Sequence, residues 1–250
     1  MNEAIDNKVE LPFISHIIEL RGRLIYCLTA FVFFSLISYF FIDYIYSILV
    51  QPLADIFEGQ NKRLIYTGLA EVFFSYIKLA LFAGGCLSFP IIAMQVWKFI
   101  APALYKNERR FFLSLLVSTP LLFFLGAAFV YYIVMPTAWN FFASFETFRL
   151  DNNILPIQLE AKVDEYLSLV MSLIFAFGMC FQMPVLFALL GKVGVVSSKS
   201  LINKRRYAVV FIFALAAFIT PPDIVSQLLL GIPLILLYEL SIALVKVIEK

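Results

Sequence analysis

Long uncharged apolar runs constrain this chain more than any other feature. A helix needs about 20 apolar residues to cross roughly 30 Å of hydrocarbon, and four such runs extend over 24–42, 79–97, 111–135 and 166–190. Only 14% of the residues are charged, against about 25% in soluble domains. The sequence therefore predicts an all-α integral membrane protein.

A further apolar region, 207–238, is interrupted by Thr-Pro-Pro-Asp at 220–223. Two prolines and an acid favour a turn over a continuous helix, so we expect two short spans joined by a tight hairpin. Residues 207–219 would reach only about 20 Å as a helix, less than the usual hydrocarbon thickness. One membrane domain over 1–250 is expected, with six transmembrane helices at about 24–42, 72–100, 111–135, 163–190, 207–219 and 224–244.

The Lys and Arg residues indicate the orientation of these spans, because cytoplasmic loops retain positive charge. With the N-terminus inside, most of the 19 Lys and Arg residues fall on the cytoplasmic side. Lys78 lies within a span, where we expect it to extend towards the interface. The outer side holds only Lys62, Arg63, Arg149 and Lys162, so both termini are predicted to be cytoplasmic.

Prolines within the spans predict bent helices. Each proline removes a backbone hydrogen bond and tends to kink its helix, although membrane helices also tolerate proline where neighbours satisfy the freed carbonyl. Taken together they favour a cupped bundle. The outer side carries two larger connections, 43–71 and 136–165, and the second contains a predicted amphipathic helix, TAWNFFASF. The intraspan prolines are Pro90, Pro120, Pro184 and Pro233.

Metal and redox chemistry find little support in the sequence. Cys27, Cys86 and Cys180 fall inside apolar runs, which favours buried, reduced thiols. His16 is the chain's single histidine, so no metal cluster is indicated. The acidic N-terminal segment lacks the basic region of a removable signal peptide, and we expect the first span to be retained.

Two charged stretches on the predicted cytoplasmic side could bind a ligand: HIIELRGRL, which contains Glu19, and FIAPALYKNERR, which contains Glu108. An interfacial anchor is the simpler interpretation, with Glu19 pairing with Arg23 one helical turn away. Alternatively, two carboxylates at one membrane face could receive a pair of guanidiniums. Each charge-assisted bond would be worth roughly 1.5–3 kcal/mol, and lysine would fit less well.

These stretches, together with FGMCFQMPV and FITPPDIVSQ, resemble TatC, the receptor subunit of the twin-arginine protein translocase, in order, spacing and membrane setting. The resemblance extends from about residue 11 to 245. It implies a cupped bundle of six helices with short fifth and sixth spans, in the cell inner membrane. It also implies that the cytoplasmic N-terminal region and first cytoplasmic loop bind twin-arginine signal peptides of folded cargo.

By motif match, Glu19 and Glu108 resemble the acids that face the cargo arginines. Five further residues would shape or support that surface: Leu20, Arg21, Phe99, Pro102 and Tyr105. Pro52 matches a proline of the first outer loop that the family links to assembly and transport.

The resemblance further implies partner proteins rather than a cofactor, in an oligomeric complex driven by the proton-motive force. Single-span TatA-type and TatB-type subunits would dock along the fifth and sixth helices, at a polar cluster of Thr220, Ser226 and Gln227, with Asp223 in the intervening turn. Gln182 stands where many relatives carry glutamate. Glutamine keeps the hydrogen bonds but cannot titrate, so a proton-dependent role there is not expected.

Other functions fit less well. Secondary transporters commonly show internal repeats and charged midplane sites, neither of which the sequence displays. An intramembrane enzyme would need a motif such as H-E-x-x-H or a Ser/His pair within the spans; the sequence has neither, and His16 is expected to lie outside the membrane core. No nucleotide or nucleic-acid site is indicated. An assembly scaffold would share the short helices and polar patches. A receptor would in addition bind signal peptides, and this property distinguishes the two.

Overall fold

A computed structural model of the chain describes residues 7–57, 63–100, 109–146, 159–219 and 224–249. In these ranges the regular structure is helical, and β pairing is limited to an isolated bridge between Ile65 and Lys162. The expectation of an all-α membrane protein is confirmed. Within the described ranges, five segments are long and apolar enough to cross a membrane: Ile14–Phe40, Glu71–Phe99, Leu113–Ala143, Val163–Lys192 and Ile224–Ile248.

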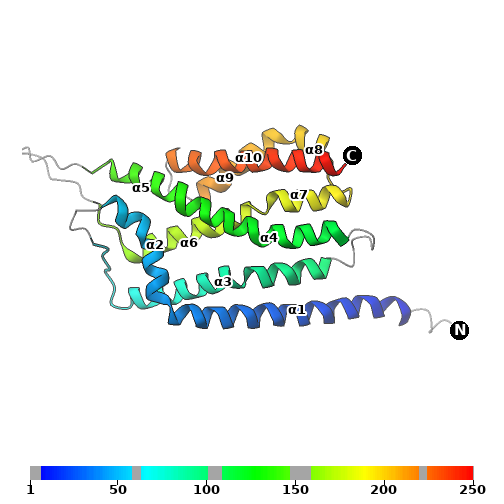
Figure 1. Cartoon of the computed structure of the whole chain (residues 1–250), viewed down its shortest axis with the longest axis horizontal. Coiled ribbons are helices and arrows are strands. Elements are labelled where there is room, and N and C mark those ends of the chain that lie inside the picture. Colours follow the sequence, from blue (N-terminus) through cyan, green and yellow to red (C-terminus); the bar gives the residue numbers. More distant parts are fainter. Residues whose placement is uncertain (1–6, 58–62, 101–108, 147–158, 220–223, 250) are drawn as a thin grey trace, which may run out of the picture. The chain divides into compact units, whose positions relative to one another are not determined.

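The helices follow one another in the order shown in Figure 1. They are α1 (Asn7–Phe40), α2 (Ile42–Ile56), α3 (Glu71–Ile100), α4 (Arg109–Phe129), the π-helical turn η2 (Val130–Val134), α5 (Met135–Ala143), α6 (Val163–Cys180), α7 (Met183–Lys192), α8 (Ser198–Asn203), α9 (Arg205–Ile219) and α10 (Ile224–Ile248).

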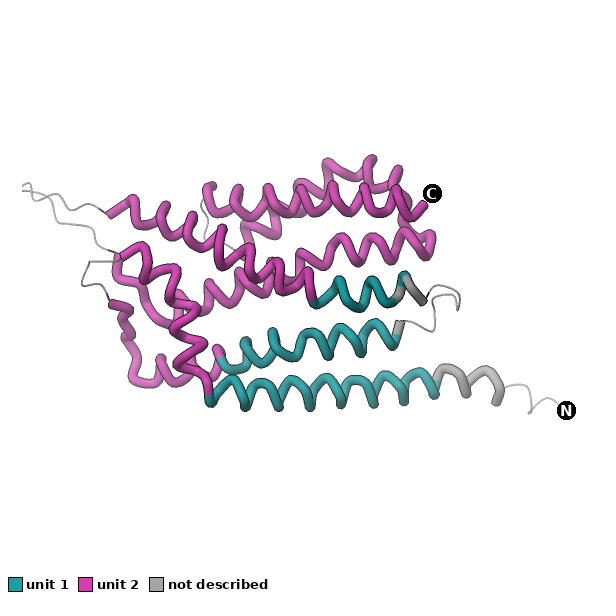
Figure 2. Tube along the Cα trace, in the orientation of Figure 1, with its two compact units in different colours: residues 1–40, 80–120 teal, residues 41–79, 121–250 magenta. Residues whose placement is uncertain are grey.

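The chain divides into two compact units, coloured in Figure 2. Unit 1 comprises residues 1–40 and 80–120, and unit 2 comprises 41–79 and 121–250. α3 and α4 therefore contribute to both units. The single membrane domain expected from the sequence stays a prediction.

In unit 1, α1 and α3 approach closely at Gly84. A Cβ added there would lie 2.5 Å from the Cα of Ser35, so only glycine permits this distance. α3 and α4 are joined by a buried hydrogen bond, in which the Trp97 indole donates to the Thr119 hydroxyl at 2.8 Å. α3 is thus joined to α1 by a glycine contact and to α4 by a polar contact.

In unit 2, α10 packs along α7 and α9. Gly191 of α7 lies against Val245, and Gly231 of α10 lies against the ring of Phe213 on α9. The Tyr238 hydroxyl donates to the carbonyl of Leu201 in α8 at 2.9 Å. Small residues let the helices approach closely, as is common between membrane helices.

The sixth and third predicted spans differ from the observed helices, whereas the short fifth span agrees. α10 has 25 residues, so the expectation that both of the last spans are short is wrong for the sixth; its helix continues through Pro233 and to Ile248. α9, with 15 residues, is short. The third span runs on through η2 into α5, so TAWNFFASF is a helix that continues the span. The six-span count and the orientation of the termini stay predictions.

The prolines differ in their effects on the helices. Pro184 separates α6 from α7, whereas Pro90, Pro120 and Pro233 lie inside continuous helices. α2, which contains Pro52, is a helix in a segment that we expected to be a connecting loop.

The intraspan Lys78 is paired. Its Nζ lies 2.7 Å from Oδ1 of Asp164, to which the Ser75 hydroxyl also donates at 3.1 Å. The expected extension of Lys78 towards the interface stays a prediction, and the acid with which it pairs lies at the start of α6. Nearby, the amide of Ile65 donates to Ala161 and that of Val163 donates to Ile65. These bonds attach the 63–68 segment to α6.

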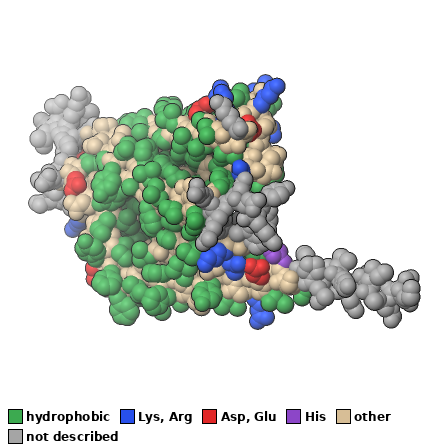
Figure 3. All heavy atoms as spheres, turned by 45° about the vertical axis from the view of Figure 1, so that its right-hand side comes forward, with side chains coloured by type: hydrophobic (Ala, Val, Ile, Leu, Met, Phe, Trp, Pro, Cys, Tyr) green, Lys and Arg blue, Asp and Glu red, His purple; other side chains and the backbone are tan. Residues whose placement is uncertain are grey.

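Hydrophobic side chains cover much of the face drawn in Figure 3. Large apolar residues remain exposed along the helices, among them Leu24 at 66%, Phe40 at 83% and Phe218 at 91%. Apolar surface of this extent indicates contact with lipid rather than water.

Candidate functional site

Glu19 lies near the start of the first membrane-spanning segment, on the face of α1 that also carries His16 and Arg23. Helix positions three, four and seven residues apart are neighbours on one face. The side chain of Glu19 is 38% exposed and that of Arg23 is 22% exposed. The carboxylate is therefore the more accessible member of this pair.

Arg23 holds the Glu19 carboxylate through one of its two oxygens. Nε of Arg23 and one terminal nitrogen both donate to Oε1 of Glu19, the Nε bond being 3.0 Å long. The other terminal nitrogen donates to Oε1 of Gln95 on α3 at 3.2 Å. Because a guanidinium is planar and its donors are fixed, Arg23 orients the acid relative to α3 within unit 1.

A second contact between α1 and α3 lies two helical turns away from the first along α1. The His16 ring stacks on the Phe99 ring, with centroids 4.3 Å apart and planes 19° from parallel. Nδ1 of His16 lies 3.8 Å from Oε2 of Glu19, which is beyond hydrogen-bond distance. Phe99 therefore supports the site by packing under His16.

This geometry leaves Oε2 of Glu19 available. Oε1 accepts both Arg23 bonds, whereas no hydrogen bond reaches Oε2 from the residues that the structure describes. A carboxylate oxygen has two lone pairs, and a charged donor forms its strongest bond to such an acceptor. The site can thus bind a cation without first breaking the Arg23 contact.

Of the other residues predicted to bind signal peptide, Leu20 and Arg21 are exposed on α1. Pro102, Tyr105 and Glu108 lie outside the described residues. The structure therefore brings Glu19 and Phe99 to one cluster, and the pairing of Glu19 with Glu108 stays a prediction.

Sequence reasoning missed Gln95 and the role of His16. Gln95 is an amide within an apolar run, four residues before Phe99, so both share one face of α3. That spacing could have been recognised in the sequence. A polar residue and an aromatic one turn apart suggest a face that contacts a charged helix.

Residues predicted to contact partner subunits lie near the start of α10. Ser226 is 5% exposed, so its hydroxyl faces the protein interior, whereas Gln227 is partly exposed. Thr220 and Asp223 lie outside the described residues.

Of the three residues predicted to have a structural or assembly role, Pro52 and Gln182 are buried, and Asp223 lies outside the described residues. Pro52 lies inside α2, and Gln182 lies in the break between α6 and α7, where its amide donates to the Gly178 carbonyl at 3.4 Å. Within the described ranges, no three His, Cys, Asp or Glu side chains come together in a way that could hold a metal ion.

Comparison with known proteins gives concordant matches. The family model for TatC, described as Sec-independent protein translocase protein, matches residues 15–233. The Sec-independent protein translocase protein TatC of Rickettsia prowazekii is 47% identical over 237 residues, which are 95% of this chain and 93% of that protein. The Escherichia coli (strain K12) protein of the same name is 42% identical over 233 residues, 92% of this chain and 86% of that protein.

Solved structures agree with these sequence matches. A crystal structure of the twin-arginine translocase receptor TatC superimposes with a TM-score of 0.80 at 39% identity, covering 94% of this chain and 100% of that chain. The resemblance noted in the sequence is thereby confirmed. This chain belongs to the TatC family, multi-pass proteins of the bacterial inner membrane that serve as components of a protein translocase.

Proposed function

We propose that this chain is the core receptor of the twin-arginine translocase, binding twin-arginine signal peptides of folded proteins at the cytoplasmic face. In this proposal Glu19 accepts a cargo guanidinium at Oε2 while Oε1 remains on Arg23. The observation that carries it is the partly exposed Glu19 carboxylate, which is held by Arg23, itself bonded to Gln95, and whose Oε2 receives no hydrogen bond from the described part of the chain. Leu20 and Arg21, both exposed beside it, would line the approach.

Site-specific crosslinking tests this proposal. A photoreactive residue at position 20, which is exposed beside Glu19 and leaves its carboxylate in place, is expected to label a twin-arginine signal peptide and to label a twin-lysine version at least about tenfold less, because lysine lacks the parallel donors. The same label at Ile18, which is exposed on a neighbouring face, serves as the control. Equal labelling of both peptides from position 20 would refute guanidinium recognition. The same labelling from position 20, repeated in Glu108→Gln, tests the predicted pairing of the two acids, because loss of the second acid should weaken labelling of the twin-arginine peptide.

We further propose that single-span TatA-type and TatB-type subunits dock along α9 and α10, and that export is driven by the proton-motive force. The partial exposure of Gln227, next to the buried Ser226, supports a polar contact at the start of α10. Gln227→Leu is expected to reduce co-purification of partner subunits, and Leu236→Gln, on an exposed stretch of the same helix, is the control. Unchanged co-purification of Gln227→Leu would remove this assignment.

The proposed topology has six crossings, with both termini in the cytoplasm. Two contacts support it: Gly191 against Val245, and Ser198 against Glu249, place the C-terminal ends of α7 and α10 at the same end of unit 2. The chain must then return to the opposite end between these helices. α9 lies antiparallel to α10, with Arg205 paired to Glu239 at 2.6 Å and Phe213 against Gly231.

The accessibility of introduced cysteines tests this topology. Cysteines placed at residues 8 and 249 should both be labelled only from the cytoplasmic side by a reagent that does not cross the membrane. Labelling of the two positions from opposite sides would show that α9 does not cross.

A further inference from the structure

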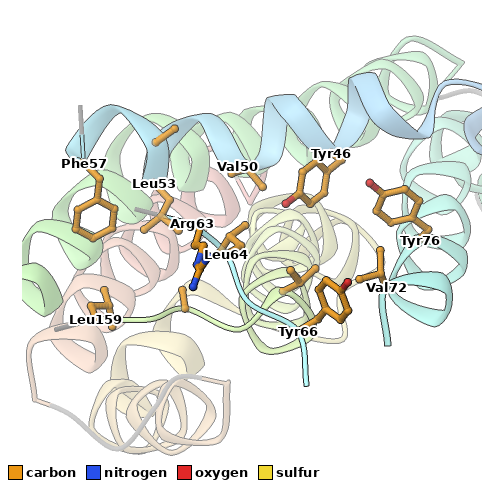
Figure 4. A pocket seen from close by; sticks show the side chains of 13 residues that line it. Tyr46, Val50, Leu53, Phe57, Arg63, Leu64, Tyr66, Val72, Tyr76 and Leu159 are labelled. Atoms are coloured by element: carbon orange, nitrogen blue, oxygen red, sulfur yellow. The ribbon is translucent and has the colours of Figure 1, made fainter. Parts of the chain in front are cut away.

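Unit 2 contains a cavity of about 470 Å³ at the end where α3 and α6 begin. Figure 4 shows side chains converging on it from α2, from the 63–66 segment and from the first turns of α3. None of its lining residues belongs to the Glu19 site, and the proposed receptor function does not use it. Small-molecule pockets have volumes of roughly 300–1,000 Å³, so this cavity is large enough for a ligand.

Most of the cavity wall is apolar. Val50 and Leu53 project from α2, Leu64 from the extended segment and Val72 from α3. Tyrosine rings complete it: Tyr46 and Tyr76 face each other with ring centroids 5.8 Å apart. Such walls favour an alkyl chain, because apolar area leaves water when the chain enters.

Arg63 is the cation of this cavity. Figure 4 places its side chain in the middle of the ring of lining residues. Among the residues described, no carboxylate lies within ion-pair distance of Arg63, and those that line the cavity include no Asp or Glu. Arginine stays charged under all ordinary conditions and its fork matches phosphate oxygens. The cavity therefore presents an unmatched positive charge beside an apolar volume.

The cavity lies at the boundary of the membrane-spanning segments. Val72 and Tyr76 belong to the first turns of the span that begins at Glu71, and Val163 begins the span that ends at Lys192. Arg63 and Tyr66 precede the first of these spans. The apolar walls thus lie at the edge of the hydrocarbon and the cation at headgroup depth, on the side that the charge distribution predicts to be outer.

We propose that this cavity binds an anionic glycerophospholipid of the outer leaflet, with its phosphate on Arg63 and part of one acyl chain against Val50, Leu53 and Leu64. The Arg63 cation and the apolar wall both favour this occupant. Free phosphate would pair with Arg63 but leave the apolar walls uncovered, and a zwitterionic lipid would bring its own cation close to Arg63.

Native mass spectrometry of the purified chain can test the lipid site. The protein is exchanged into detergent containing either phosphatidylglycerol or phosphatidylcholine, and the lipid retained per chain is counted. Phosphatidylglycerol should be retained, and Arg63→Gln should reduce its retention about tenfold, as expected for the loss of a charge-assisted contact. Arg206→Gln, at an exposed arginine of α9 outside the cavity, should change nothing.

A second variant tests the apolar half of the site. Ala54 is exposed at the rim of the cavity, so Ala54→Trp should occupy the volume without disturbing the core and should reduce retention with Arg63 intact. Its thermal unfolding should match that of the unmodified protein. Equal retention of both lipids, or unchanged retention in both variants, would overturn the proposal. Displacement of phosphatidylglycerol by millimolar inorganic phosphate would also overturn it, since the site would then recognise the free anion alone.

Discussion

The hydroxyl of Tyr131 donates a hydrogen bond of 2.9 Å to the carbonyl oxygen of Ile48, the carbonyl that Pro52 leaves without a helical partner. In an α-helix the amide of residue i+4 fills this acceptor, and proline has no amide hydrogen. One residue further on, the Tyr166 hydroxyl donates to the Leu49 carbonyl at 2.8 Å in a buried setting. Two tyrosines from η2 and α6 thus support α2 at its proline.

This arrangement predicts unequal effects of removing the two hydroxyl groups. Tyr166→Phe should lower the free energy of unfolding by about 1–2 kcal/mol, because the lost bond is buried. Tyr131→Phe should cost about 0.5 kcal/mol, since its bond is accessible and water can replace it. Denaturant unfolding in detergent measures both. Tyr132→Phe, at a residue 74% exposed, is the control, and a loss in that variant equal to the loss in Tyr166→Phe would contradict the assignment.

The tyrosine pair illustrates what could be predicted from the sequence. Pro52 could be marked as structural from its position in a recognisable motif, but its partners could not. Tyr131 and Tyr166 are distant in sequence and lie in apolar runs, where a tyrosine looks like any other aromatic residue. Only the packing of α2 against η2 and α6 makes their hydroxyl groups donors to one helix.

Lys78 and Asp164 provide a second prediction about unit 2. Their charges lie 2.7 Å apart, with side chains 52% and 33% exposed, so the pair should be worth about 1 kcal/mol or less. Lys78→Met should destabilise the protein by about that amount, because it leaves Asp164 with Ser75 alone. Lys78→Met combined with Asp164→Asn should recover part of the loss. Strictly additive losses in this double-mutant cycle would show that the two side chains do not interact.

The Lys78 pair also shows the limit of reasoning from one span at a time. Lys78 is one intraspan charge when α3 is considered alone, and extension to the interface is then the best available state. Asp164 is 86 positions away in sequence. Long-range pairing of this kind depends on how α3 and α6 are joined, which the spacing of charges along the sequence does not reveal.

The contacts of Glu249 at the end of α10 predict that the stability of the fold depends on pH. The hydroxyl and the backbone amide of Ser198 donate to this carboxylate and lower its pKa from the ordinary value of 4.5. A carboxyl group whose pKa is lower in the folded state stabilises the fold above about pH 4.5, and that contribution disappears as the pH falls through the lowered value. The stability difference between the unmodified protein and Glu249→Gln should therefore be present at pH 7 and shrink steadily below pH 4.5.

Thermal unfolding of both proteins at a series of pH values between 7 and 3 measures this difference. Glu239→Gln, a change at an acid of the same helix that pairs with Arg205 instead, separates the Ser198 contact from general loss of charge. A difference that grows as the pH falls would contradict the assigned sign.

Several residues of the candidate site could be predicted from the sequence, but the contact between α1 and α3 that supports them could not. Glu19 and Phe99 could be named from motifs, and the pairing of Glu19 with Arg23 follows from helix periodicity. Gln95 could not be connected to them, because the register between α1 and α3 is set by side-chain packing and by the glycine contact at Gly84. The sequence pattern shows which residues share a helix face, whereas the structure shows which faces are in contact.

That glycine contact supplies the last prediction, which links packing in unit 1 to the site. A Cβ at position 84 would lie 2.5 Å from Cα and 2.6 Å from the amide nitrogen of Ser35. Backbone atoms cannot rotate away, so Gly84→Ala must separate α1 from α3, at a cost of about 1–3 kcal/mol. The 3.2 Å bond between Arg23 and Gln95 should break as the helices part.

Gly22→Ala is a matched control on α1, because nothing lies within 4 Å of a Cβ at that position. It should leave stability unchanged or raise it by up to about 1 kcal/mol, the helix-propensity difference between the two residues. Crosslinking from position 20 to a twin-arginine peptide should weaken in Gly84→Ala and persist in Gly22→Ala. Full crosslinking in a destabilised Gly84→Ala protein would mean that Glu19 acts without the support of α3, and Arg23 alone would then suffice to position it.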